Sequence, residues 1–106
     1  MAYPTIRYSD HALNERESED ITSADVRSVL RMGEVTEVIE EYLDDPRGPS
    51  YLMFAMVGGR PLHVCAADQS DVDEPYTLVV TTYIVNAKKR VFGDDYKTRL
   101  VPRRAR

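Results

Sequence analysis

The dipeptide Gly58-Gly59, set between two apolar runs, constrains the fold of this chain more than any other feature. Glycine adopts positive φ without a steric penalty, so two in a row suit both central positions of a type I′ turn. Residues 51–57 form a continuous apolar run, as expected of a central strand covered on both faces. We therefore predict that Tyr51–Val57 and Pro61–Ala67 pair as an antiparallel hairpin.

Two further strands are expected around this hairpin. Residues 35–43 mix apolar and acidic side chains at a period near two, which predicts a strand with Glu37, Glu40 and Glu41 on an exposed face or edge. Residues 76–85 are rich in Val, Thr, Tyr and Ile, which favours a long strand. Polar, Pro- and Gly-containing loops are expected over 44–49 and 68–75, and one more short element around 91–100.

Two helices are expected before the strands. Ser9 and Asp10 are N-cap residues, and residues 11–18 contain no helix breaker. The second helix has Thr22 as N-cap with Asp25 three residues on, which resembles a capping box. Ile21 and Val26 suit a hydrophobic staple, and the helix has an apolar face and a glycine stop formed by Val26, Val29, Leu30 and Gly33.

These elements predict an α+β fold, with both helices packed on one face of an antiparallel sheet of about four strands. At 106 residues, we expect a single domain over 1–106, with a basic tail from about residue 88. The order of elements has no β-α-β alternation and Gly58-Gly59 does not open a helix, so a doubly wound nucleotide-binding fold is not expected.

Composition suggests a soluble protein of a reducing compartment. No apolar stretch approaches the length of a membrane span, and residues 1–10 have no apolar core of a secretory signal. Cys65 is the only cysteine, so an internal disulfide and any zinc site built on paired cysteines are excluded. We expect a cytoplasmic protein without a membrane partner.

Charge is distributed unevenly along the chain. Residues 1–87 carry six basic and sixteen acidic side chains, whereas residues 88–106 carry eight basic and two acidic ones. An acidic body with a basic tail is typical of contact with a nucleic acid or an acidic partner. The alternative is that Arg103, Arg104 and Arg106 are simply a solvated chain end.

The two histidines are the only side chains whose ordinary pKa lies near neutrality. His11 begins the first helix, where it is either a site residue or a solvated side chain. His63 lies within a strand, where it shares a face with Cys65 and Ala67, and it is either a site residue or a half-buried residue with a satisfied ring. Tyr83 could donate a proton, stack on a base, or merely pack across strands.

Arginines supply the candidate phosphate contacts, because a guanidinium matches two phosphate oxygens at once. Arg16 and Arg60 are the main candidates, with Arg99 in the tail as a third. No metal site is predicted, since no His-x3-His or similar spacing occurs. No cofactor is expected, and Cys65 is interpreted as an inert core thiol.

Several short motifs together resemble the bacterial domain of unknown function 4258 family, over roughly residues 9–85. In order, these motifs are His11-Ala12, Ile21-Thr22, Asp25-Val26, Val29-Leu30, Gly33-Glu34-Val35, Glu40-Glu41-Tyr42, Asp44-Asp45, Gly59-Arg60-Pro61-Leu62-His63-Val64 and Thr82-Tyr83. That family is similar to the RelE-like toxins and the barnase–colicin–RelE ribonuclease fold. The resemblance implies a sheet-backed site with His11, Arg60, His63 and Tyr83, and an antitoxin protein as partner.

The chain departs from the family pattern in two places. The first helix carries Glu15, Glu17 and Glu19, with Arg16 as its only basic residue, and the segment after Tyr83 is basic.

Two functions follow from these patterns. The first is a metal-independent endoribonuclease toxin that cleaves RNA with His11 or His63 as base, Tyr83 as acid and arginines on the phosphate. The second is a non-catalytic module that binds protein or RNA, either a degenerate toxin or a regulatory partner. Convergence of His11, Arg60 and His63 on one accessible cleft would favour the toxin. A buried His63 with His11 pointing away would favour the module.

Overall fold

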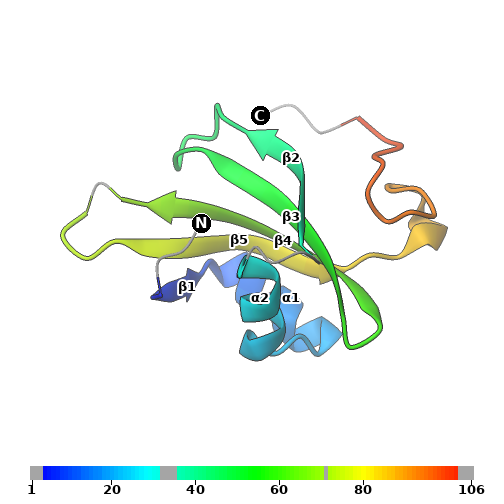
Figure 1. The fold of residues 1–106 in the computed structure, drawn as a ribbon, viewed down its shortest axis with the longest axis horizontal. Coiled ribbons are helices and arrows are strands. Elements are labelled where there is room, and N and C mark those ends of the chain that lie inside the picture. Colours follow the sequence, from blue (N-terminus) through cyan, green and yellow to red (C-terminus); the bar gives the residue numbers. More distant parts are fainter. Residues whose placement is uncertain (1–3, 32–35, 71, 103–106) are drawn as a thin grey trace.

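The fold consists of one five-stranded sheet with two helices on one of its faces (Figure 1). A computed structural model describes residues 4–31, 36–70 and 72–102. The strands are β1 (Ile6–Tyr8), β2 (Glu37–Tyr42), β3 (Ser50–Val57), β4 (Arg60–Gln69) and β5 (Tyr76–Ile84), in the order β1-β5-β4-β3-β2. The α+β class and the two helices are therefore confirmed.

The β3–β4 hairpin has the predicted turn. Gly58 and Gly59 adopt φ of 57° and 77°, and Val57 pairs directly with Arg60 on the other side of the turn. β5 pairs antiparallel with β4, and β2 pairs antiparallel with β3. β4 extends through Gln69, two residues further than predicted, because Asp68 and Gln69 pair with Thr77 and Tyr76 of β5.

The prediction of about four antiparallel strands is wrong in one respect, since β1 is a fifth strand and runs parallel to β5. Its three residues pair with Thr77–Val79, and the Thr77 and Ser9 amides donate to the Thr5 and Val79 carbonyls at 2.9 and 3.0 Å. A strand this short leaves no periodicity in the sequence. The alternation of apolar and polar residues therefore cannot predict a parallel edge strand of this length.

The helices α1 (Asp10–Glu19) and α2 (Ser23–Leu30) begin at the predicted caps. The Ser9 side chain accepts from the Ala12 amide, and Thr22 and Asp25 form the reciprocal capping box. Val26, Val29 and Leu30 are buried, as predicted. The predicted stop at Gly33 lies outside the described residues, and α2 ends at Leu30. No helix in the described ranges is long and apolar enough to cross a bilayer.

Each face of the sheet has its own apolar cluster. The helix-side cluster joins both helices to Met53, Leu62, Val64 and other inward residues of β3, β4 and β5. The opposite face carries a second cluster made by Tyr42, Leu52, Cys65, Val85 and Phe92. The alternation predicted for β4 is confirmed, because Leu62 and Val64 face the helices whereas Cys65 faces away. Residues beyond β5 cover part of the second cluster (Figure 1).

Asp45 anchors the β2–β3 loop from a buried position that the sequence did not predict. Its carboxylate accepts from the Arg47 backbone amide at 2.9 Å, from Arg47 Nε at 3.1 Å and from Ser50 Oγ at 3.0 Å. Burial alone would raise the pKa of Asp45, but these hydrogen bonds outweigh it and lower the pKa to about 2. The carboxylate therefore stabilises the fold in its ionised form.

We expect this group to make the protein sensitive to acid. Its pKa is lower in the folded chain than in the unfolded one, so its contribution is complete above about pH 4 and is lost as pH falls through about 2. Urea unfolding should show Asp45→Asn to be less stable by about 2 kcal/mol at neutral pH, with a shallower decline of stability in acid. Equal acid profiles for the variant and the wild type would contradict this assignment.

Tyr8 buries its hydroxyl without a hydrogen-bond partner among the described residues. Burial raises the pKa of this phenol, although Arg16 lies with its guanidinium carbon 4.6 Å from the centre of the ring. Because the unpaired hydroxyl gains nothing from folding, Tyr8→Phe should leave the free energy of unfolding unchanged or raise it slightly. A loss above about 1 kcal/mol in urea unfolding would instead indicate a bound partner for this hydroxyl.

Candidate functional site

The predicted site residues fall on opposite faces of the sheet. His63, Tyr83 and Arg99 lie together on the face opposite the helices, where all three contact the same cluster of side chains. His11 and Arg16 lie on α1, and Arg60 follows the β3–β4 turn and contacts the helix layer. The sheet therefore separates the first trio from the second.

His63 is fully buried and both of its ring nitrogens are hydrogen-bonded. Nε2 lies 2.6 Å from the Tyr96 carbonyl oxygen, which can only accept, so Nε2 carries the proton. Nδ1 lies 3.1 Å from the Tyr83 hydroxyl, which donates a hydrogen bond to it. Phe92 and Phe54 pack edge-on against the imidazole, with ring centres 4.6 and 5.7 Å away.

This environment keeps the His63 ring neutral. Burial lowers the pKa of His63 to about 4, although the hydrogen bond to Tyr96 and the Glu40 carboxylate act in the opposite direction. Burial also raises the pKa of Tyr83, with Tyr42 adding to the rise. At neutral pH, His63 and Tyr83 are both uncharged and bonded to each other.

Arg99 reaches this face from the C-terminal segment and binds Glu40 of β2. Its Nε and Nη2 donate to the two carboxylate oxygens at 2.6 and 2.9 Å, and its guanidinium carbon lies 4.8 Å from the centre of the Phe92 ring. The Tyr42 hydroxyl also donates to Glu40. The hydrogen bond to Glu40 raises the pKa of Arg99, so the guanidinium stays charged.

The prediction for Glu40 is therefore wrong. The sequence analysis placed this residue with Glu37 and Glu41 on an exposed face or edge. Its side chain is only 19% exposed. The sheet register shifts between Val38 and Glu40, and after this irregularity Glu40 lies opposite Leu52, on the face away from the helices. No signal in the sequence marks this shift. The contact between Tyr96 and His63 and the hydrogen bond from Tyr42 to Glu40 were likewise not predicted.

Residues 91–100, which we call the 91–100 segment, cover this cluster. An isolated bridge pairs Phe92 with Arg99, and the Leu100 amide donates to the Val91 carbonyl at 2.8 Å. Residues opposite each other in such a pair point to the same side. Phe92 and Arg99 therefore face the sheet, and Val91 and Leu100, which are 37% and 48% exposed, face outward.

The two arginines on the helix side are held by protein groups. Arg16 Nε donates to the Ile21 carbonyl at 3.0 Å, which ties the end of α1 to the loop before α2. Arg60 binds the Asp25 carboxylate at 3.1 Å and the Glu19 carbonyl at 3.3 Å. Both side chains link secondary-structure elements in this conformation, and neither lies beside His63.

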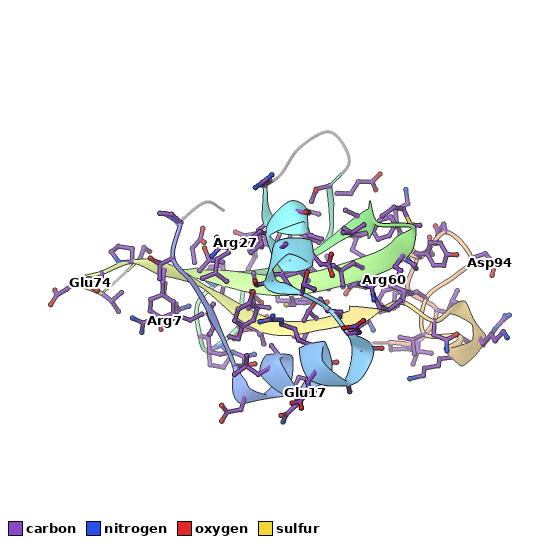
Figure 2. The ribbon with its side chains drawn as sticks, turned by 90° about the horizontal axis from the view of Figure 1, so that it is seen from below. Arg7, Glu17, Arg27, Arg60, Glu74 and Asp94 are labelled. Carbon is purple, nitrogen blue, oxygen red and sulfur yellow. The ribbon has the colours of Figure 1, made fainter. Side chains whose placement is uncertain are left out.

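His11 is exposed on α1 and pairs with Glu15 at 3.0 Å. Glu15 in turn accepts from the Thr81 hydroxyl and from the Thr82 amide at 3.3 Å, while Glu19 accepts from the Ile84 amide at 3.1 Å. β1 is too short to cover this stretch of β5, so the two glutamates satisfy its edge amides. Glu17 points outward into solvent (Figure 2). Two of the three glutamates of α1 thus have a structural role.

An open cleft of about 390 Å³ lies between the end of α1 and the chain that follows β5. Tyr83 lines it, so this residue lies between His63 and solvent. The other residues around the cleft are Glu15, Ser18, Glu19, Ile84, Val85, Asn86, Lys89, Val91 and Phe92.

A run of cations borders this cleft. Lys88 and Lys89 end the short 3₁₀ helix η1 (Ala87–Lys89), and Arg90 follows it with φ of 60°. All three are exposed, and none forms an ion pair with another described residue. We call Lys88, Lys89 and Arg90 the cation run. Among the described basic residues of the predicted tail, Lys97 and Arg99 are paired with glutamates, and these three are not.

Within residues 4–31, 36–70 and 72–102, no group of three or more His, Cys, Asp or Glu side chains is arranged to hold a metal ion. Cys65 is buried in the cluster beneath Phe92, in agreement with its interpretation as a core thiol.

Comparison with known proteins identifies a family. A family model described as "Domain of unknown function (DUF4258)" matches residues 8–84 of the chain. No curated protein and no solved structure matches it. The matched range begins at Tyr8, the last residue of β1, contains both helices and the other four strands, and ends before the cation run and the 91–100 segment.

Proposed function

The chain belongs to the DUF4258 family, and from its own side chains we propose that it is a non-catalytic RNA-binding module. The proposal rests on the burial and the separation of the two candidate catalytic histidines. His63 is fully buried with both nitrogens bonded, and His11 lies on the other side of the sheet. General acid–base cleavage needs a base and an acid within reach of one substrate.

The cation run supports RNA as the ligand. Three consecutive exposed cations without an ion pair suit the phosphates of a polyanion, because neutralised phosphates release counterions. The adjoining cleft offers the Asn86 amide and the edge of Tyr83 for contacts to a single-stranded base. The acidic body, with net charge −4 for the whole chain, restricts such contact to this end of the molecule.

The test is binding and cleavage measured on one sample. The purified full-length chain is titrated into a fluorescein-labelled single-stranded RNA, anisotropy is followed, and the same RNA is then run on a denaturing gel. The proposal predicts saturable binding that weakens with salt, and intact RNA after prolonged incubation. Cleavage that disappears in His63→Ala or His11→Ala would overturn it. Absence of binding at low salt would do so as well.

A second candidate is the endoribonuclease toxin, and it is favoured by the meeting of His63, Tyr83 and Arg99 on one face. With Glu40 and Tyr42 beside them, this face holds a carboxylate, an imidazole and two phenols, which are suitable bases and acids for metal-free cleavage. An RelE-like relationship and an antitoxin partner belong to this proposal. It requires the 91–100 segment to move aside.

Growth of a bacterial host under tightly induced expression separates the candidates. The toxin proposal predicts arrest by the wild type and relief by His63→Gln at equal soluble yield. The binding-module proposal predicts equal growth with both chains. Arrest by both chains would point to a toxic effect that does not use His63.

A further inference from the structure

The 91–100 segment is bound to the sheet in an unusual way. In the described part of the chain, its main-chain hydrogen bonds to other main-chain groups all lie within the segment, from Gly93 to Thr98, Tyr96 to Gly93 and Leu100 to Val91. None of these joins it to a strand of the sheet. Its attachment to the sheet therefore rests on side chains and on the single Tyr96 carbonyl.

Three polar links and two aromatic contacts provide this attachment. The links are Tyr96 carbonyl to His63, Arg99 to Glu40, and Lys97 to Glu37 at 3.2 Å. Phe92 is 3% exposed and packs on the His63 ring, and the Tyr96 ring lies against Phe54 with ring centres 6.3 Å apart. Breaking these contacts removes no strand pairing, so the segment can leave while the five strands stay paired.

Backbone strain occurs at the start and in the middle of the 91–100 segment. Arg90, directly before the segment, and Tyr96, whose carbonyl binds His63, adopt φ of 60° and 65°. Left-handed conformations are unfavourable for residues other than glycine. Release of the segment lets both residues relax, which partly offsets the lost contacts.

We propose that the 91–100 segment is a releasable cover that controls access to the His63–Tyr83 face of the sheet. When it is closed, Tyr96 and Arg99 occupy the hydrogen-bonding groups of His63 and Glu40. When it is open, a ligand meets the His63 N–H as a donor and the Glu40 carboxylate as an acceptor, while the Tyr83 and Tyr42 hydroxyls keep their bonds to these two groups. One donor beside one acceptor suits a neutral ligand group that both accepts and donates, such as a hydroxyl or an amide. The inference does not depend on RNA binding by the cation run.

Cys65 provides a probe of this opening. It is the only cysteine of the chain, is 5% exposed, and lies in the cluster that Phe92 covers. The experiment measures the rate at which a thiol reagent such as dithionitrobenzoate labels the native full-length chain at increasing urea concentrations. Local opening exposes little surface, so labelling through it has a rate that is nearly independent of urea. Labelling through global unfolding has a rate that rises steeply with urea, because unfolding exposes much more surface.

We expect a urea-independent phase in the wild type, accelerated about tenfold or more in Arg99→Gln, which loses the Glu40 pair. Lys97→Gln is the matched control, because it removes a cation of the same segment from an exposed pair, and it should change the rate less than about twofold. The proposal would be overturned if the rate of Cys65 labelling followed the urea dependence of global unfolding at every urea concentration, both in the wild type and in Arg99→Gln. Equal acceleration by the two variants would also count against it.

Discussion

Replacing the cation run by Lys88→Gln, Lys89→Gln and Arg90→Gln together is expected to abolish most of the RNA affinity of this protein. Three phosphate contacts to single-stranded RNA give a slope of about −2 in log affinity against log salt. Wild-type binding should therefore weaken roughly 20-fold between about 50 and about 200 mM salt, and the triple variant should lose this dependence. Fluorescence anisotropy at several salt concentrations measures both quantities.

The matched control removes three cations elsewhere. Arg7, Arg27 and Arg31 lie on β1 and around α2, and Arg7 and Arg27 are far along the molecule from the end that carries Asp94 (Figure 2). Their joint replacement by glutamine changes the net charge equally but should leave the salt slope near that of the wild type. If both triple variants weaken binding alike, the effect is one of net charge and the cation run is not the contact surface.

The second large effect is expected at Glu40. Glu40→Gln leaves the Arg99 guanidinium with a neutral partner. The Arg99 side chain is only 23% exposed, so solvent compensates little for the lost charge. We expect the free energy of unfolding to fall by about 2 kcal/mol, between the values typical of exposed and buried ion pairs. Chemical denaturation monitored by circular dichroism measures the change.

Glu37 supplies the comparison within the same strand. It pairs with Lys97 of the same segment, but its side chain is 54% exposed. Glu37→Gln should therefore cost less than about 0.5 kcal/mol. Equal losses for the two variants would mean that burial does not distinguish these pairs, contrary to the geometry described above.

The parts of the fold that follow from local rules could be predicted from the sequence. Positive φ at Gly58 and Gly59, the Thr22–Asp25 capping box and the alternation along β4 depend on residues close together in the chain. Strand β1 could not be predicted, because three residues carry no period and their partner is about 70 residues away. Glu40 was misplaced because a register shift in a single strand changes the face of a side chain.

The candidate site was predictable only in part for a related reason. Alternation put His63 on the correct face, but what covers that face is decided by Phe92 and Tyr96, in a segment without regular structure. His11 was grouped with His63 by motif resemblance, and the sheet that separates them appears only in three dimensions. The glutamates of α1 were noted only as a departure from the family pattern, whereas Glu15 and Glu19 accept hydrogen bonds from backbone amides at the edge of β5.

The central claim is that the 91–100 segment, through Phe92, Tyr96 and Arg99, closes over His63 and Tyr83, so that the imidazole of the resting protein is not accessible on this face. Its most direct test is an NMR titration of the two imidazoles in the full-length chain, assigned with His11→Gln. We predict that His63 stays neutral, protonated on Nε2, until the pH falls to about 4. A His63 that titrates near its ordinary value of 6.5 would show a solvated ring and contradict the account.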